Sequence, residues 1–387
     1  MSNPTTRKEA LQLLQDEGWN VVPVQEFEVR RLEREDCWGV ARCFYAVYGP
    51  TYPFDYLYIP DRLWNENHVQ NTYSVVAVAT DGSVIGYGAI YRSTAPYSGL
   101  YEIGQYLVLP EYRTTTAAFK IQEFLLKQVA PDIPLDELFG EAVCNHIVSQ
   151  KMGAFAGFRE CALELGLMPA VPGGAQSGTA RRISTLLQFK GISRLLREAY
   201  LPAQYRAQLE YLYSGFSLQR TFAEGDGAVP PGSSTRATSQ FFNVAGVARF
   251  NIQNLGSDFF ETVLMLEEHA LQRKIGVLQV FLNLGEPHVG NAISVLQSAG
   301  YVFGGLLPCW FGSDGLLMQK LPDLPDLDAI ALYSERAHRI LDFIRMDIEN
   351  NPAAQLITRS LPFIPGDIPL TKAADLPDVT ISGEGLT

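Results

Sequence analysis

Residues 108–119, VLPEYRTTTAAF, decide the fold of this chain. An apolar strand end meets a proline and Glu-Tyr-Arg, and then three threonines and two alanines open a helix. Apolar residues recur there at three- and four-residue spacing, which predicts one buried helical face: Ala117, Ile121, Phe124, Leu125 and Val129. The first N–H groups of a helix lack intrahelical partners, and the helix dipole favours negative charge there. The stretch therefore predicts a phosphate-binding site at the N-terminus of this helix, with Arg113 beside it.

Composition limits the classes of function. The chain has 387 residues and a formal net charge of −12, which argues against a general nucleic-acid or anionic-membrane surface. No apolar run reaches the length of about 18 residues that a transmembrane helix needs, and the start of the chain has no secretory apolar region. Five cysteines without a C-x-x-C pair predict reduced thiols and a cytoplasmic protein. The five histidines show no metal-ligand spacing, so we expect no metal.

Strands and helices alternate along the first half. YSVVAVAT and SVIGYGAIY flank Asp81-Gly82, which predicts a two-residue hairpin with a type I′ turn. We expect strands at residues 100–109 and 141–144, and a short helix at 149–156. Ser149 is the expected N-cap of that helix, and Gly157 its left-handed C′ residue. Strands near 161–167 and 183–189 follow, separated by the loop VPGGAQSGTA.

The second half repeats this order, which predicts an internal duplication, although strand–helix alternation is common enough for coincidence. We expect an extended segment at 241–253, a helix capped by Ser257 and a strand at 276–284. A short helix stopped by Gly300 and two last strands complete it. The predicted domains are an N-terminal helical extension (1–25), two α/β units (26–190 and 191–322), and a C-terminal helix with a tail (323–387).

The first half resembles the GNAT superfamily of acyl-CoA-dependent N-acyltransferases. The matching pieces are the Asp-Gly hairpin, YEIGQYLVLPEYR leading into a helix, and a strand followed by a short helix ending in Gly157-Phe158. The element order of the second half also resembles a GNAT unit. The resemblance implies an α/β (α+β) fold of tandem GNAT-like units. Each would have a mixed, mostly antiparallel sheet with a central parallel strand pair flanked by helices.

The resemblance also implies a cofactor site. The superfamily signature Q/R-x-x-G-x-G/A, whose backbone N–H groups surround the pyrophosphate of coenzyme A, would begin at Arg113 and end at Ala118. Its middle glycine is replaced by Thr116, a β-branched residue that tolerates a positive φ poorly. The implied co-substrate is acetyl-CoA or another acyl-CoA, unless the fold has lost its ligand. Its expected contacts are the strand residues Leu107, Val108 and Leu109 and the loop residues Arg113, Thr114, Thr115, Thr116, Ala117 and Ala118.

Acyl transfer to an amine needs a base for the ammonium and a proton for the leaving thiolate. The candidate bases are Glu102, Glu141 and His146, and the imidazole is attractive because it titrates near neutral pH unperturbed. Related enzymes often take the acid from a tyrosine in the short helix, where this chain has Gly153. Tyr106 or Tyr112 could replace it only if the fold aims one of them inward.

The aromatic stretch at 48–64 would lie where such proteins bind the acceptor. Its tyrosines offer apolar faces with hydroxyl tips, which suit a small aromatic or aliphatic acceptor, or else they pack a core: Tyr48, Tyr52, Tyr56 and Tyr58. Before the long helix of the second half the signature is missing, and Asp258 adds an unfavourable negative charge. We therefore read that half as a degenerate copy used for packing, substrate shaping or dimerisation.

The sequence leads to three hypotheses. The first is an acyl-CoA-dependent N-acyltransferase acting on a small-molecule acceptor, with acetyl-CoA as the expected donor and the cofactor in the first unit. The second is a non-catalytic acyl-CoA-binding or regulatory protein. The third is a GNAT-like enzyme with other acyl-CoA chemistry, such as decarboxylation. Neither nucleic acid nor membrane is an expected partner, and a homodimer is left open.

Overall fold

The structure is a computed structural model that describes residues 4–92, 94–169, 182–192, 195–216, 219–243, 245–359 and 379–381. Side chains are described up to residue 355. The chain divides into two compact units. Of the described residues, the first unit contains those up to 94 and Ser98–Gly140, and the second contains Ala95–Tyr97 and those from Glu141 onward. The predicted loop VPGGAQSGTA lies outside the described residues.

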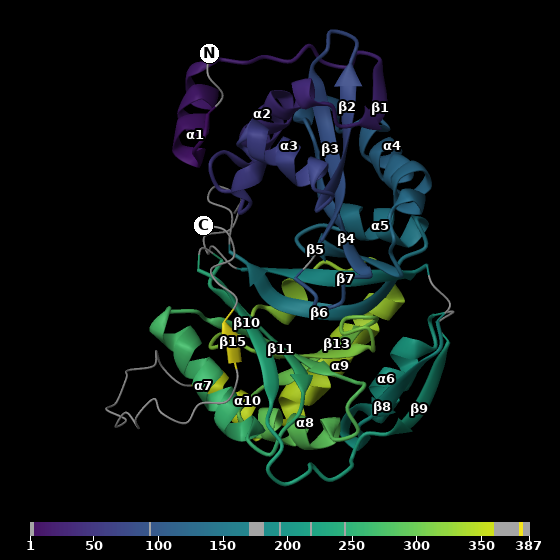
Figure 1. Cartoon of the computed structure of the whole chain (residues 1–387), viewed down its shortest axis with the longest axis vertical. Coiled ribbons are helices and arrows are strands. Elements are labelled where there is room, and N and C mark those ends of the chain that lie inside the picture. The colour runs from purple at the N-terminus through teal and green to yellow at the C-terminus, as the bar shows by residue number, and fades with distance from the viewer. Residues whose placement is uncertain are drawn as a thin grey trace. The chain divides into compact units, whose positions relative to one another are not determined.

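The first unit is a five-strand sheet with helices on both faces. Its strands lie in the order β1-β2-β3-β4-β5, and each neighbouring pair is antiparallel except β4–β5, which is parallel. Figure 1 shows α2 and α3 on one side of β2 and β3, and α4 on the other. The strands are β1 (Phe27–Arg31), β2 (Thr72–Ala79), β3 (Val84–Arg92), β4 (Leu100–Val108) and β5 (Glu137–Val143), whose last residues belong to the second unit. The helices are α1 (Arg7–Asp16), α2 (Cys37–Tyr48), α3 (Pro60–His68) and α4 (Ala117–Phe124).

The predicted hairpin is confirmed, but its turn is of another type. A type I′ turn needs a positive φ at both central residues, and of Asp81 and Gly82 only the glycine has one, at 86°. The N–H of Ala79 donates to the carbonyl of Ser83, and the Asp81 carboxylate accepts from the N–H of Ser83. This is the longer hairpin loop in which a left-handed glycine follows a right-handed turn.

The second unit contains two strand–helix–hairpin segments and a C-terminal helix. The first segment is α5 (Val148–Phe155), β6 (Arg159–Met168) and β7 (Ile183–Gly191). The second is the sheet β10-β11-β12-β14-β13, in which only β11–β12 is parallel. The elements of this part are β8 (Arg197–Leu201), α6 (Arg206–Tyr213), β9 (Arg220–Glu224), β10 (Arg236–Phe242), β11 (Val247–Asn254), α7 (Phe259–Gln272), β12 (Val277–Asn283), α8 (Val289–Ser298), β13 (Val302–Leu307), β14 (Gly315–Lys320), α9 (Glu335–Asn350), α10 (Pro352–Arg359) and β15 (Val379–Ile381).

The order of elements agrees between the two halves of the sequence. In the first, antiparallel β3–β4 leads through α4 to a parallel strand, and then α5 leads to the antiparallel pair β6–β7. In the second, antiparallel β10–β11 leads through α7 to a parallel strand, and α8 leads to the antiparallel pair β13–β14. The predicted domain boundaries at 25, 190 and 322 stay a prediction, because the compact units divide inside β5.

Some local expectations are wrong. Residues 241–253, expected as one extended segment, contain the last two residues of β10 and most of β11, which are separate antiparallel strands. Neither Ser149 nor Ser257 caps its helix, because α5 begins after Ile147 and α7 after Asp258. The hydroxyl of Ser257 donates instead to the carbonyl of Ser233. The left-handed Gly157 is confirmed, with φ of 83°.

The C-terminal helix packs into the second unit. On α9 one face is buried, and Arg336 donates to the carbonyls of Glu160 and Leu212. All five cysteines are buried, and none forms a disulfide within the described residues, in line with the predicted reduced thiols. None of the helices in the described ranges is both long and apolar enough to cross a membrane.

Candidate functional site

A β-bulge interrupts β4 in the first unit. Tyr87 pairs with Leu107 and Ala89 with Gly104, so that Gln105 and Tyr106 together stand opposite Gly88. Gln105 has a φ of 55°, in the left-handed region that residues with a Cβ seldom adopt. Bulges of this kind occur often beside active sites, where they redirect a side chain and free backbone groups from the ladder.

Strand β4 is also open along its edge towards β5. The parallel pairing covers only Leu100 to Glu102 of β4, whereas β4 runs on to Val108 and stays paired with β3. Within the described residues no further β4–β5 pair follows Glu102. The bulge and the residues after it therefore lie beyond the three pairs that β4 forms with β5. An unpaired strand edge can pair with an extended ligand.

The loop after β4 presents N–H donors at the start of α4. The N–H groups of Thr116 and Ala118 have no acceptor among the described residues, whereas that of Ala117 donates to the Thr115 hydroxyl at 3.2 Å. Arg113 is exposed, and its Nε donates to the carbonyl of Val108 at 3.3 Å. Two unpaired N–H donors, a helix dipole and a guanidinium thus occur on one short loop, which can bind an anion.

Thr116 does not have the backbone conformation that favours glycine. Its φ is −84° and its ψ is 8°, outside the region of positive φ. The position expected to need glycine therefore does not need it here. Of the other predicted contacts, Leu107, Leu109 and Ala117 are buried, Val108, Thr115 and Ala118 are half-buried, and Thr114 and Thr116 are exposed.

The corresponding strands of the second unit are closed. The parallel pairing of β11 with β12 runs over six residues, Val247–Ile252 with Val277–Leu282, without interruption. The register of β10–β11 shifts only at its first residue, Arg236, so that no bulge lies inside the pair. This strand pair leaves no gap that an extended ligand could enter.

The loop before α7 is hydrogen-bonded to other parts of the protein. The Asp258 carboxylate accepts from the N–H of Thr235 at 2.7 Å, and the Thr235 hydroxyl accepts from the N–H of Gly256. The Glu286 carboxylate accepts from the N–H of Leu255 at 3.3 Å. One carboxylate, Glu286, therefore accepts from an N–H of this loop, and a second, Asp258, belongs to the loop itself. Both negative charges oppose the binding of a phosphate there.

Glu102 and the bulge lie on one face of β4. A Cβ on Gly104 would lie 3.2 Å from the Tyr91 hydroxyl and 3.6 Å from Glu102 Oε1. The Tyr91 hydroxyl donates to Glu102 Oε1, and the Gln105 amide donates to the Tyr56 hydroxyl. A carboxylate and an amide are thereby held among aromatic side chains.

The structure brings three of the predicted acceptor tyrosines to this face. Burial raises the pKa of Tyr52 well above its usual value and that of Tyr56 to about 12, and the charge of Glu102 adds to both shifts. Tyr48 lies 4.8 Å from Tyr52 between ring centroids. Tyr58 differs, because it is fully buried and its hydroxyl donates to the carbonyl of Gly49. Its contacts hold the loop in place.

Tyr106 and Tyr112 point elsewhere. A Cβ on Gly88 would meet both the Tyr106 ring and Ile121 of α4, so Tyr106 lies on the face opposite Glu102. Burial raises the pKa of its hydroxyl, which has no partner among the described residues. Tyr112 is buried, and its hydroxyl donates to the carbonyl of Val22. Neither tyrosine joins the face of Glu102.

His146 belongs to the second unit. Its ring is exposed, and Nδ1 accepts from the N–H of Val148 at 3.3 Å at the start of α5. In the same helix, a Cβ on Gly153 would overlap the amide of the buried Gln188. Gln188 therefore occupies the space beside Gly153, and any side chain at that position would have to displace it.

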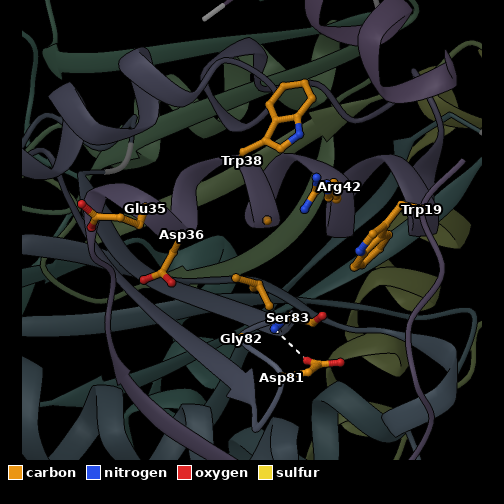
Figure 2. A pocket seen from close by; sticks show the side chains of 10 residues that line it. Trp19, Glu35, Asp36, Trp38, Arg42, Asp81, Gly82 and Ser83 are labelled. Carbon is orange, nitrogen blue, oxygen red and sulfur yellow. Dashed lines mark hydrogen bonds between the residues drawn. The ribbon is translucent and has the colours of Figure 1, made fainter. Parts of the chain in front are cut away.

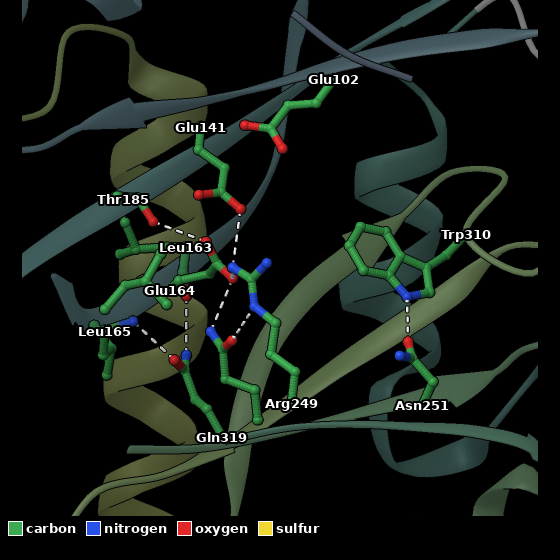
Figure 3. A network of polar contacts seen from close by, with 12 residues as sticks. Glu102, Glu141, Leu163, Glu164, Leu165, Thr185, Arg249, Asn251, Trp310 and Gln319 are labelled. Carbon is green, nitrogen blue, oxygen red and sulfur yellow. Dashed lines mark hydrogen bonds and ion pairs between the residues drawn. The ribbon is translucent and has the colours of Figure 1, made fainter. Parts of the chain in front are cut away.

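Glu141 is part of a buried polar network in the second unit (Figure 3). Arg249 on β11 donates to Glu141 Oε1 at 2.9 Å and to Glu164 Oε1 at 3.0 Å. The Gln279 amide and the Thr185 hydroxyl donate to the Glu164 carboxylate, each at 2.8 Å. Burial, followed by the nearby charge of Glu141, raises the pKa of Glu164 to about 7.

Two small cavities lie outside these residues. One, of about 280 Å³, lies in the first unit, and Figure 2 shows its lining, which includes Trp19, Trp38 and Arg42. Arg42 donates to the Glu17 carboxylate at 2.8 Å, so its charge is already paired. The other, of about 290 Å³, lies in the second unit beside Arg220, whose guanidinium is paired with Asp314. We assign no ligand to either.

Sequence reasoning missed Gln105 and Tyr91. A glycine followed by a polar residue inside the apolar run YEIGQYLVL does signal a bulge. Tyr91 lies near the end of β3, and only the register of β3 against β4 places it opposite Glu102. Among the described residues, no group of three or more His, Cys, Asp or Glu side chains could hold a metal ion.

The chain is similar in structure to GNAT acetyltransferases over about 44% of its length. The ribosomal-protein-S5-alanine acetyltransferase from Vibrio fischeri is 14% identical with a TM-score of 0.35, and the match covers 44% of this chain and 97% of that one. An N-acetyltransferase from Staphylococcus aureus Mu50 is 16% identical with a TM-score of 0.34, covering 43% and 99%. The spermidine/spermine N-acetyltransferase SpeG from Vibrio cholerae is 12% identical with a TM-score of 0.33, covering 43% and 95%. No protein-family model and no curated protein sequence matches the chain.

Proposed function

We propose that this protein is an acyl-CoA-dependent N-acyltransferase with a single cofactor site, in the first half of the chain. The observation that carries the proposal is the contrast between two equivalent strand pairs. The pairing of β4 with β5 ends after three residues and β4 bulges there, whereas β11 and β12 stay paired over six. An acyl-pantetheine arm is extended and rich in amides, so it suits an open strand edge.

The loop at the start of α4 supports the same ligand. The pyrophosphate of coenzyme A would accept from the N–H groups of Thr116 and Ala118 and meet the charge of Arg113. In the second half, Asp258 belongs to the equivalent loop and Glu286 accepts from one of its N–H groups. We infer that the second half is a duplicated unit without a cofactor.

Glu102 is the proposed base. Its carboxylate lies on the face of the bulge among aromatic side chains, where it can remove a proton from the acceptor ammonium. The free amine would then attack the thioester carbon to give a tetrahedral intermediate. Its collapse would break the C–S bond, and the thiolate would take up the proton that the attacking nitrogen loses, giving the amide and the free thiol of coenzyme A. Tyr91 already donates to Glu102, which fixes the direction of the carboxylate.

A non-catalytic acyl-CoA-binding protein is the second candidate, because Gln188 fills the space beside Gly153, where related enzymes carry their acid. The experiment that separates the two is the release of free coenzyme A thiol from acetyl-CoA in the presence of a panel of amines. Amine-dependent release supports the enzyme. Binding of acetyl-CoA without release by any amine would leave the second candidate.

A further inference from the structure

The side-chain carbonyl oxygen of Gln105, Oε1, is buried and accepts no hydrogen bond from the described residues. Gln105 is 8% exposed, and its Nε2 donates to the Tyr56 hydroxyl. Buried amide oxygens are almost always paired, because an unpaired one loses its hydration without compensation.

The backbone of Gln105 is unusual as well. Its φ of 55° is the left-handed conformation, which a residue with a Cβ adopts only when its surroundings hold it there. A regular strand would send the side chains of neighbouring residues to opposite faces. The bulge instead brings the Gln105 amide to Tyr56, on the face of Glu102, and leaves Tyr106 towards α4.

The surroundings of this oxygen favour a cation. Glu102 supplies negative charge, which acts on Tyr52 and Tyr56. Phe54 lies 5.9 Å from Tyr56 and 6.5 Å from Tyr91 between ring centroids, so an aromatic cluster adjoins the carboxylate to which Tyr91 donates. An ammonium group is attracted by both a carboxylate and aromatic rings.

We propose that Gln105 is a specificity-determining residue that selects amines carrying a second hydrogen-bond donor, as amino alcohols and diamines do. The ammonium nitrogen lies at Glu102, and the second N–H or O–H donates to Gln105 Oε1. The proposal rests on the proposed function, since it names the acceptor class of that same site. An amine without the second donor leaves Oε1 unpaired and binds more weakly.

The test measures equilibrium binding of amines to the full chain by calorimetry, with and without coenzyme A, so that it does not depend on turnover. Ethanolamine and its longer homologues are each compared with the alkylamine in which a methyl group replaces the hydroxyl. We expect at least one amino alcohol to bind about tenfold more tightly than its alkylamine. In Gln105→Met the ratio of the two affinities, amino alcohol to alkylamine, should fall to about one. In Gln105→Glu, which keeps an acceptor oxygen, the ratio should stay at about ten.

Gln128→Met is the matched control, because Gln128 is exposed in the same unit. Three results would overturn the proposal: a ratio near one for every pair in the unchanged protein, an unchanged ratio in Gln105→Met, or no binding of any amine. If Gln105→Met does not fold, the ratios of the unchanged protein and of Gln105→Glu still decide. Failure of acetyl-CoA to bind would contradict the proposed function, whereas loss of amine selectivity alone would contradict only this inference.

Discussion

The guanidinium of Arg249 donates to Glu164 Oε1 at 3.0 Å, and Glu164 is fully buried. Arg249 lies on β11 and Glu164 on β6, which are far apart in the sequence. The contact therefore links the two strand–helix–hairpin segments of the second unit through a buried hydrogen bond from a guanidinium to a carboxyl group. Such a contact adds little net stability, because both groups lose their hydration.

The titration of Glu164 gives the first prediction. Its pKa is raised from 4.5 to about 7 in the folded protein. The contribution of Glu164 to the free energy of unfolding is therefore complete below about pH 4.5 and is lost as the pH rises through about 7. Relative to Glu164→Gln, the free energy of unfolding of the unchanged protein should therefore fall as the pH rises across that interval.

Urea unfolding of the two proteins between pH 4.5 and 8 measures this difference. The amide introduced by Glu164→Gln does not titrate, so the other carboxylates cancel in the comparison, and the difference should become constant above pH 8. A difference that does not change with pH would mean that Glu164 stays ionised throughout.

The base gives the second prediction. Glu102→Gln keeps the size and the hydrogen bond from Tyr91 but cannot take a proton. We expect kcat to fall by about a hundredfold or more, the range of general-base catalysis, with little change in the KM for acetyl-CoA. Glu26→Gln, an exposed site in the same unit, is the control. An unchanged kcat would remove Glu102 from the mechanism.

Thr116 gives the third prediction. Because its φ is −84°, glycine there would relieve no strain. Thr116→Gly should leave the affinity for acetyl-CoA within about threefold and lower the stability by roughly 0.5–1 kcal/mol, the entropic effect of glycine. Calorimetry and urea unfolding measure the two effects. A large gain in affinity would show that the ligand requires a backbone conformation that threonine resists.

Gly153 gives the fourth prediction. Alanine normally stabilises a helix relative to glycine by about 1 kcal/mol. Here the added Cβ would overlap the amide of Gln188, so Gly153→Ala should lower the stability by about 1–3 kcal/mol. In a Gln188→Ala background the same change should be neutral or stabilising. If Gly153→Ala stabilises the unchanged protein, Gln188 is not the reason for the glycine.

The sequence predicts the elements that carry a local pattern. The hairpin at Asp81-Gly82, the helix after VLPEYR and the turn at Gly157 each follow from residues within a few positions of one another. A predicted helix N-cap fails where the hydroxyl of the serine finds its partner in a distant part of the sequence. Ser257 has the right chemistry for an N-cap, but its hydroxyl donates to the carbonyl of Ser233, on the loop before β10. No spacing rule reports such a contact.

The candidate site was predictable in part for the same reason. Glu102, Tyr52 and Tyr56 could be proposed from residue type and order. In the structure the carboxylate of Glu102 is close enough to raise the pKa of both tyrosines. The role of Gln105 depends on the left-handed bulge that brings its amide to their face. The difference between the two strand pairs depends on register, which the apolar runs of β5 and β12 do not reveal.

The central claim is one acyl-CoA site, in the first half of the chain. Calorimetric titration with acetyl-CoA tests it most directly, with the stoichiometry as the readout. We predict one site per chain, and a loss of about tenfold or more in affinity in Arg113→Ala, as expected for a lost charged phosphate contact, but not in the exposed control Arg62→Ala. Two sites per chain, no binding, or equal affinity of Arg113→Ala and the unchanged protein would contradict the account.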